Sequence, residues 1–224
     1  MKVVLLSYTK DAERLCAAAA HSCYSMDPAS EILENVTEDK AGGFIDKVVG
    51  MGHHSVIEHA SYTFSLEGVS RSLTHQLVRH RLASYSQQSQ RYVSLLEPDY
   101  VTPGPVLADP EANRIFEGAM QNAWEAYQQL VSIVPVEDAR YVLPNACTTN
   151  IVVTMNAREL WHFFTLRTCR RAQQEIRTAA ELMLKEVREI SPSIFRDAGP
   201  SCIRGKCREG KLSCGKPRLE LKYI

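Results

Sequence analysis

The residues best suited to binding and chemistry lie in the stretch RHRLASYSQQSQRY, which runs from Arg79 to Tyr92. Arg79, Arg81 and Arg91 offer planar guanidinium groups that suit phosphate, and the serines and glutamines between them add hydrogen-bonding groups. The stretch is therefore a candidate site for small phosphorylated ligands. A solvated basic loop and a nucleic-acid patch are the alternatives, although a series of stacking aromatic residues is missing.

A second candidate lies in NARELWHFFTLRTCRR, from Asn156 to Arg171. On a helix, Arg167 falls three and four residues beyond Phe164 and Phe163, on the same apolar stripe. A guanidinium on a buried face is costly unless an anion or an acceptor meets it. The pattern fits either a bound ligand or an internal arginine–carboxylate pair.

Three histidines and Glu58 lie in GHHSVIEH, from Gly52 to His59. Their spacing does not match the H-E-x-x-H zinc helix, and no distant further ligand stands out. Hydrogen bonding to an organic ligand through Ser55 and Glu58 fits this segment better than a metal.

Cysteines form the last group of reactive side chains. Cys202, Cys207 and Cys214 are separated by four and six residues in a Gly/Lys-rich tail, which is not the paired C-x2-C pattern of zinc sites. Free thiols are favoured over a structural metal, and no metal site is predicted. Cys147 in LPNAC is interpreted as a small buried residue rather than a nucleophile.

Mainly helical elements must position these residues. We expect Ser70 and Asn156 to cap helices, and we expect residues 98–110 to form a loop. Helices separated by a few strands, without regular βαβ alternation, predict an α+β fold. Strands are predicted at residues 2–8, 60–69 and 148–155, and helices at 11–24, 37–51, 70–81, 112–134, 156–169 and 172–190.

The composition narrows the class of protein. The chain has 224 residues, 45% of them apolar, which suits a single domain, predicted at 1–195, followed by a Cys/Lys/Gly-rich tail at 196–224. Lys plus Arg and Asp plus Glu number 26 each, so the basic excess of a protein that grips long nucleic acid is missing. No apolar run approaches the roughly 20 residues of a membrane span, and no export signal is evident. We therefore expect a cytoplasmic protein that binds neither nucleic acid nor membrane, with reduced cysteines.

The stretch RHRLASYSQQSQR resembles the signature of flavin-dependent thymidylate synthases, an Arg-His-Arg triplet followed after seven residues by a serine, here Ser89. GHHSVIEH, EDARYVLP and NARELWHFFTLR resemble further motifs of the family, in the same order along the chain. The similarity spans roughly residues 50 to 190. Several motifs in order are far more specific than any one of them.

The resemblance implies helices around a central, mainly antiparallel sheet, and a homotetramer whose active sites are shared between subunits. It implies an FAD-dependent methyltransferase of nucleotide biosynthesis that converts dUMP to dTMP. Methylenetetrahydrofolate would donate the carbon, and NADPH would reduce FAD. No cysteine need attack the uracil ring, because Arg167 would stabilise the anion that develops on the base. The order of methylene transfer and the choice between NADPH and NADH stay open.

Site residues carry over motif by motif. The resemblance implies FAD contacts at Ser55, Glu58, Arg79, His80, Arg81 and Gln87, and from another subunit at Asn156, Arg158 and His162. It implies dUMP contacts at Gln76, Arg79, Gln87, Gln88, Ser89, Gln90, Arg91, Arg140 and Arg167. Arg91 and Arg140 suit the phosphate, and Ser89 is expected to bind rather than to attack. Gln87 replaces an acidic residue of some relatives, and Arg171 replaces a histidine.

Three alternatives remain on sequence grounds. A different flavin- or nucleotide-dependent transferase could share the fold. A small RNA-binding module could use the segment from Arg79 to Arg91. A cysteine-dependent thymidylate synthase would rest on Cys147 as its nucleophile.

Overall fold

The structure is a computed structural model that describes residues 1–93, 97 and 99–218. Four strands form one sheet in the order β1-β2-β4-β3, with bounds Lys2–Tyr8 (β1), Ser61–Ser70 (β2), Thr148–Asn156 (β4) and Ala83–Gln87 (β3). The central pair is antiparallel, because Thr63 of β2 meets Thr154 of β4 while Gly68 N donates to Asn150 Oδ1. Helices make up most of the other elements, so the predicted α+β class is confirmed.

Contacts within the chain divide it into two compact units. Unit 1 comprises Met1–Lys2, Leu66–Arg79 and Tyr85–Val152. Unit 2 comprises Val3–Ser65, His80–Ser84 and the chain from Val153 onward. The predicted boundary near residue 195 stays a prediction. Among the described residues, no helix is both long and apolar enough to cross a membrane.

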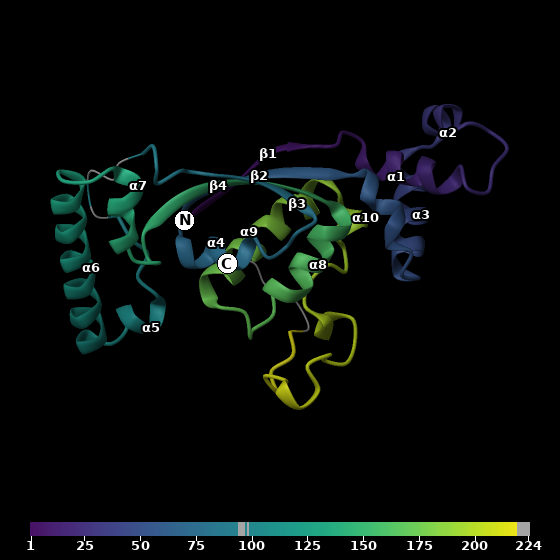
Figure 1. Cartoon of the computed structure of the whole chain (residues 1–224). Coiled ribbons are helices and arrows are strands. Elements are labelled where there is room, and N and C mark those ends of the chain that lie inside the picture. The colour runs from purple at the N-terminus through teal and green to yellow at the C-terminus, as the bar shows by residue number, and fades with distance from the viewer. Residues whose placement is uncertain (94–96, 98, 219–224) are drawn as a thin grey trace. The chain divides into compact units, whose positions relative to one another are not determined.

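Unit 2 is built from helices around a cluster of aromatic side chains. Helix α1 packs against α2 and α3, α10 packs against α3 and α9, and α8 lies beside α9 (Figure 1). The Phe195 ring lies edge-on to Tyr62 and Phe164, with centroids 5.3 and 6.0 Å away, and such buried rings contribute much of a core's apolar area. The elements are α1 (Ala12–His21), α2 (Ala29–Asn35), α3 (Glu38–Gly50), α8 (Ala157–Arg167), α9 (Gln174–Ile190) and α10 (Pro192–Phe195), with the 3₁₀ turns η1 (His54–His59), η3 (Ser201–Ile203) and η4 (Gly210–Leu212).

Unit 1 centres on one long helix, α6, flanked by α5 and α7 (Figure 1). The side chain of Asp109 begins α6 by accepting a hydrogen bond from Ala112 N at 2.9 Å. Along α6 the Tyr127 side chain is buried but Ile115 is 59% exposed, so unit 1 leaves part of the helix's apolar surface uncovered. The helical elements are α4 (Arg71–Leu77), α5 (Gly104–Leu107), α6 (Pro110–Val131), α7 (Val136–Ala139) and η2 (Arg140–Val142).

Both predicted helix caps are confirmed. Ser70 Oγ accepts from Leu73 N at 3.0 Å, and Asn156 Oδ1 accepts from Glu159 N at 2.9 Å. These bonds satisfy amide groups that have no partner within the helix. The caps fix where α4 and α8 begin, and therefore where their polar side chains lie.

Three predictions of local structure were wrong. The helix after Ser70 ends at Leu77 instead of near Arg81. At this end the Tyr85 hydroxyl donates to the Leu77 carbonyl at 2.8 Å. Strand β3 was missed because its sequence, ASYSQ, is mostly polar. The predicted loop at 98–110 contains α5 and the first residue of α6, and its residue 98 lies outside the described residues.

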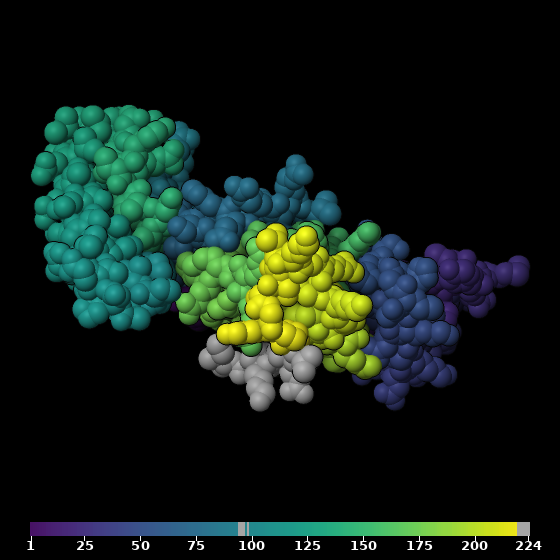
Figure 2. All heavy atoms as spheres, turned by 90° about the horizontal axis from the view of Figure 1, so that it is seen from below, coloured from purple at the N-terminus to yellow at the C-terminus, as the bar shows by residue number. Residues whose placement is uncertain are grey.

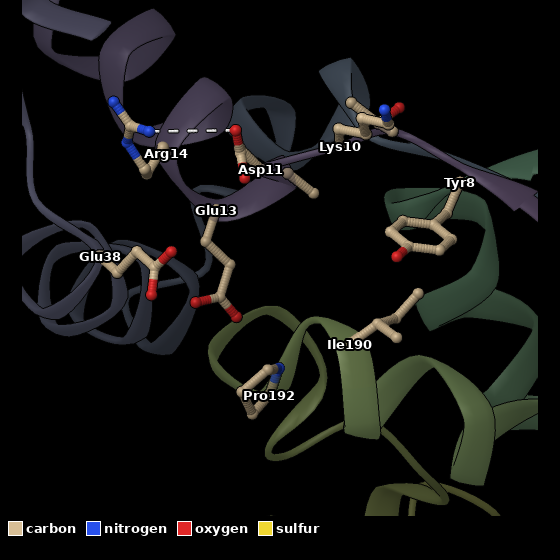
Figure 3. A pocket seen from close by; sticks show the side chains of 10 residues that line it. Tyr8, Lys10, Asp11, Glu13, Arg14, Glu38, Ile190 and Pro192 are labelled. Carbon is tan, nitrogen blue, oxygen red and sulfur yellow. Dashed lines mark ion pairs between the residues drawn. The ribbon is translucent and has the colours of Figure 1, made fainter. Parts of the chain in front are cut away.

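A cavity of about 480 Å³ lies in unit 2, where the end of β1 and the start of α1 meet the α9–α10 junction (Figure 3). Glu13 Oε1 accepts from Ser193 N at 2.6 Å, and Arg14 donates to Leu33 O at 2.6 Å. Both side chains thus stabilise helix ends. No site residue expected from the sequence lines this cavity.

The Tyr62→Phe variant should lower the free energy of unfolding by roughly 1–2 kcal/mol. The Tyr62 hydroxyl donates to Ser191 Oγ at 2.8 Å, and both residues are buried, so the substitution removes a donor where water does not replace it. Urea denaturation followed by circular dichroism measures the loss. The matched control is Tyr24→Phe at a residue that is 91% exposed, and an equal loss in the two variants would contradict the assignment.

Candidate active site

Three side chains of unit 2 form a hydrogen-bonded chain along one face of α8. Glu159 and Arg167 lie about two helical turns apart, with Phe163 midway between them. His80 Nδ1 lies 3.0 Å from Glu159 Oε1, and His80 Nε2 accepts from Arg167 Nε at 3.1 Å. The imidazole packs edge-on against Phe163, with ring centroids 5.0 Å apart. These contacts hold the ring of His80 in one orientation.

The protonation state of His80 follows from its partners. Arg167 always donates, so Nε2 must accept, and the proton sits on Nδ1 and is donated to Glu159. Burial, followed by the charges of Arg167 and His162, lowers the pKa of His80 to about 4. Burial raises the pKa of Glu159. An ion pair would raise the pKa of His80 and lower the pKa of Glu159, which is the opposite of these shifts. The link is therefore a hydrogen bond from a neutral imidazole.

The same region has the ligand types of a metal site. Single ligand atoms of His80, Glu159 and His162 lie within 4.8 Å of one another, which makes them the one such group in the described part of the chain. Both ring nitrogens of His80 are engaged, however, and a guanidinium donates to one of them. A cation would have to displace that positive charge, so the group is better described as a hydrogen-bonded cluster.

A cavity of about 780 Å³ in unit 2 is lined by other residues of the same helix. The guanidinium carbon of Arg204 lies 4.7 Å from the centroid of the Trp161 ring. Three arginines face one carboxylate, so the cavity suits an anionic ligand, and its aromatic residues suit a planar group. The lining residues that carry this character are His54, Arg158, Trp161, His162, Asp197, Arg204 and Arg208.

His54 contributes a neutral ring to this cavity. Burial lowers the pKa of His54, against a hydrogen bond with the Val49 backbone, and the charges of Arg204 and Arg158 lower it further. The ring also lies against Trp161, with centroids 4.9 Å apart. His54 belongs to the histidine-rich segment for which the sequence favoured an organic ligand over a metal, and here its ring packs against Trp161.

The structure brings together some of the expected FAD contacts in unit 2. Glu58 forms an ion pair with Arg158, one turn before His162 on α8. Ser55 lies exposed on the same 3₁₀ turn as Glu58. Of two further expected contacts, the Asn156 side chain caps α8, and Arg81 is exposed in the segment before β3.

In unit 1 the end of β3 is tied to its neighbours. Gln87 Nε2 donates to Thr74 Oγ1 at 3.0 Å, so this side chain is already held by α4. Gln88 N donates to Asn150 O at 2.9 Å, which fixes the backbone next to β4. Two of the expected dUMP contacts are therefore rigidly placed.

The turn after β3 collects charged residues. Ser89 Oγ accepts from Arg91 N at 3.1 Å and so shapes the turn that contains Gln90. Arg91 Nε donates to Glu137 Oε2 at 2.8 Å, and Arg140 Nε donates to the Glu137 carbonyl at 3.1 Å. The two arginines expected to hold the phosphate thus meet at one residue, Glu137.

Arg71 is a functional candidate that the sequence reasoning missed. It donates to Gln88 O at 2.8 Å, while its buried Nε has no hydrogen-bond partner. Burial and the nearby charge of Arg140 lower its pKa. The sequence did contain one signal for Arg71: it lies in the first turn of a predicted helix, where a positive charge is unfavourable because it opposes the helix dipole. Arg71, Arg91 and Arg140 together make this part of unit 1 suitable for an anion.

The remaining expected residues of unit 1 are more ordinary. Gln76 is half-buried on α4, with Nε2 3.5 Å from Ser72 O, and Arg79 is exposed beyond the end of that helix. Cys147 is buried, and burial raises the pKa of its thiol. A nucleophilic cysteine needs the opposite shift, so the structure does not favour a role in attack.

A model of the family described as "Thymidylate synthase complementing protein" matches residues 4–193. A relative from Geobacter sulfurreducens, named flavin-dependent thymidylate synthase, is 53% identical over 219 residues, covering 96% of this chain and 94% of the relative. A relative of the same name from Clostridium tetani is 48% identical over 241 residues, covering 100% and 96%. The chain belongs to the flavin-dependent thymidylate synthase family.

A solved structure supports the same family membership. The UMP/dUMP methylase PolB from Streptomyces cacaoi, bound with 5-Br dUMP, superimposes with a TM-score of 0.72 at 26% identity, covering 87% of this chain and 93% of that chain. Membership of the flavin-dependent thymidylate synthase family therefore agrees with the order of the sequence motifs and with the fold.

Arg171 stands where the resemblance leads us to expect a histidine. Its guanidinium donates to Glu209 Oε2 at 2.7 Å and to Leu212 O at 2.8 Å. Arg171 therefore holds the C-terminal segment in place.

Lowering the pH from 6.5 toward 4 should reduce the free energy of unfolding. The unfolded chain takes up a proton near pH 6.5 at residue 80, whereas folded His80 stays neutral down to about 4, so acid favours the unfolded state. The contribution is on the order of 3 kcal/mol across this window. Urea titrations at several pH values measure the slope.

The His80→Phe variant should show a shallower slope in the same titrations. His54, whose pKa is also lowered, adds a slope of the same sign, so the variant removes only part of it. His75→Gln, at an exposed residue, serves as the control and should keep the wild-type slope. An unchanged slope in His80→Phe would show that His80 is not held neutral.

Proposed function

We propose that this protein converts dUMP to dTMP by reductive methylation, with FAD as cofactor, methylenetetrahydrofolate as carbon donor and NADPH as reductant. The observation that carries the proposal is the half-buried guanidinium of Arg167, held by a buried neutral imidazole in a chain of this family. The named relatives and the dUMP methylase support the class of reaction.

The 780 Å³ cavity of unit 2 fits the chemistry of a flavin nucleotide. A pyrophosphate calls for guanidinium groups, which Arg158, Arg204 and Arg208 offer, and a planar ring system calls for aromatic neighbours such as Trp161. When bound, FAD supplies the hydride that completes the new methyl group. Arg158 and His162 would contact it, as expected from the motif. The resemblance assigned Glu58 and Arg158 to different subunits, but the two form an ion pair within one chain, so Glu58 would orient Arg158 of its own subunit.

The arginines of unit 1 would hold the phosphate of dUMP. Arg91 and Arg140 already meet at Glu137, and a phosphate dianion would offer both guanidinium groups a more highly charged acceptor. Arg71, whose buried Nε has no hydrogen-bond partner, adds positive charge to the same region. Ser89 would position the nucleotide through the turn that it shapes.

Arg167 would act on the uracil base. Transfer of the methylene group to uracil C5 requires electron density at that carbon, and ionisation at N3 supplies it. A guanidinium fixed before the reaction stabilises the developing anion without reorganising, and a half-buried site strengthens the interaction. Glu159 and His80 would act as positioning residues, because they orient the guanidinium plane through Nε.

A homotetramer with shared active sites is part of the proposal. Tyr127 is the one buried residue of α6, and Ile115 is 59% exposed, which supports packing of this long helix against another subunit. Light scattering of the purified protein would test this assembly.

An anaerobic assay tests the reaction itself. Purified protein receives NADPH, then dUMP and methylenetetrahydrofolate, while the visible spectrum is recorded and dTMP is measured by mass spectrometry. We expect flavin absorbance that bleaches with NADPH and returns as dTMP appears. A colourless protein that neither takes up FAD nor makes dTMP would overturn the proposal and would direct attention to RNA binding.

The Arg167→Ala variant should lose dTMP formation by roughly 10²–10³-fold while retaining FAD, because its target is the base. Turnover and flavin content are measured on the same sample. Arg79→Ala is the comparison, since Arg79 is expected to contact FAD. If Arg167→Ala lost FAD as readily as Arg79→Ala, its assignment to the base would be wrong.

The two Glu159 variants separate positioning from charge. Glu159→Gln keeps an acceptor for the Nδ1 proton of His80 and should retain most of kcat. Glu159→Ala removes that hydrogen bond, which at about 1.4 kcal/mol should lower kcat about tenfold with a smaller effect on KM for dUMP. Equal loss in both variants would indicate that the carboxylate acts through its charge instead.

A further inference from the structure

Four of the chain's cysteines line one cavity of unit 2, with a volume of about 270 Å³. Cys169 follows α8, and Cys202, Cys207 and Cys214 belong to the C-terminal segment. This segment forms a compact yellow patch on the face shown in Figure 2. All four are free thiols, and Cys169, Cys202 and Cys207 are partly buried while Cys214 is exposed. The structure thus adds a fourth cysteine to the three that stood out in the sequence.

The C-terminal segment is held against the helix that precedes Cys169. Arg171 donates to Glu209 Oε2 and Leu212 O at 2.7 and 2.8 Å. Arg218 donates to Thr168 O at 2.8 Å, on the residue before Cys169. Earlier in the segment, Arg204 Nη2 donates to Thr165 Oγ1 at 3.3 Å. These bonds hold residues 204 to 218 of the segment against α8 and the loop after it, which keeps the tail cysteines near Cys169.

The charge around the cavity favours thiolates. Five cations and one carboxylate line it, and nearby Lys and Arg side chains stabilise a thiolate. A metal bound by four thiolates carries net negative charge, which such surroundings offset. Cys202 Sγ already accepts a hydrogen bond from Arg218 N at 3.3 Å, as sulfur ligands often do. The charged lining residues are Arg170, Arg171, Lys206, Glu209, Lys216 and Arg218.

The spacing of the sulfur atoms indicates the kind of metal centre. Tetrahedral zinc with bonds of about 2.3 Å holds its sulfur ligands about 3.8 Å apart. No three of the four described sulfur atoms lie within 4.8 Å of one another, since the group found at that spacing is His80, Glu159 and His162. A hollow with more widely separated thiols suits a polynuclear core, and four cysteines are the usual ligands of a [4Fe–4S] cluster.

We propose that Cys169, Cys202, Cys207 and Cys214 form a four-thiolate metal site that holds an iron–sulfur cluster. The site lies in the C-terminal segment and the loop after α8, outside the motifs that mark the family. It fastens the segment that supplies Arg204 and Arg208 to the larger cavity of unit 2. The proposal does not depend on the reaction assigned to this protein.

Metal and sulfide analysis of the full-length protein, purified without oxygen because Cys214 is exposed, tests the proposal. We expect about four iron and four sulfide per chain, and an electron paramagnetic resonance signal after reduction with dithionite. One zinc per chain with no sulfide would support the four-thiolate site and overturn the cluster. Wild-type protein that holds neither metal, even after anaerobic reconstitution with ferrous iron and sulfide or with zinc, would overturn the site itself.

Single variants locate the metal. Cys169→Ser, Cys202→Ser, Cys207→Ser and Cys214→Ser should each lose most of the iron and sulfide. Cys23→Ser, at an exposed cysteine elsewhere in unit 2, is the matched control and should keep both. Circular dichroism checks that each variant is folded. Full metal content in the four folded variants would contradict the assignment of these ligands.

Discussion

The imidazole of His80 lies between the Glu159 carboxylate and the Arg167 guanidinium, and only a neutral ring can satisfy both neighbours. Burial makes the neutral form favourable, and the packing of Phe163 against the ring leaves it one orientation. The direction of the Arg167 guanidinium depends on this arrangement. A freely rotating arginine would lose much of its value to a reaction that needs a fixed positive charge.

Helix α8 makes the arrangement possible. Its cap at Asn156 fixes where the helix begins, and positions 159, 163 and 167 then follow one another along a single face at successive turns. Arg158 and His162 lie on another face and line the large cavity of unit 2. One helix therefore supplies both the group proposed to act on the base and groups proposed to hold the cofactor.

Sequence patterns predicted the elements that are regular and missed those set by distant contacts. Strands β1 and β2 and the two helix caps were predicted because their sequence signals are local. Strand β3 carries polar residues and exists because β4 pairs with it. Helix α4 ends four residues before its predicted end, at Leu77, whose carbonyl accepts a hydrogen bond from the Tyr85 hydroxyl.

The same distinction applies to the site. The sequence showed that Arg167 on an apolar stripe needed an acceptor, but it offered a ligand or a carboxylate and not His80, which lies 87 residues away along the chain. Arg71 escaped notice because its importance rests on burial and on Arg140. Cys169 was not grouped with the tail cysteines for the same reason: only the fold brings it to their cavity.

The most direct test of this account is a nitrogen-15 NMR measurement of the His80 ring, assigned by comparison with His80→Phe. At neutral pH we expect a neutral imidazole with its proton on Nδ1, and this state should persist well below pH 6.5 because burial lowers the pKa to about 4. A charged ring, or a neutral ring protonated on Nε2, could not accept from Arg167. Either result would contradict the proposed orientation of the guanidinium.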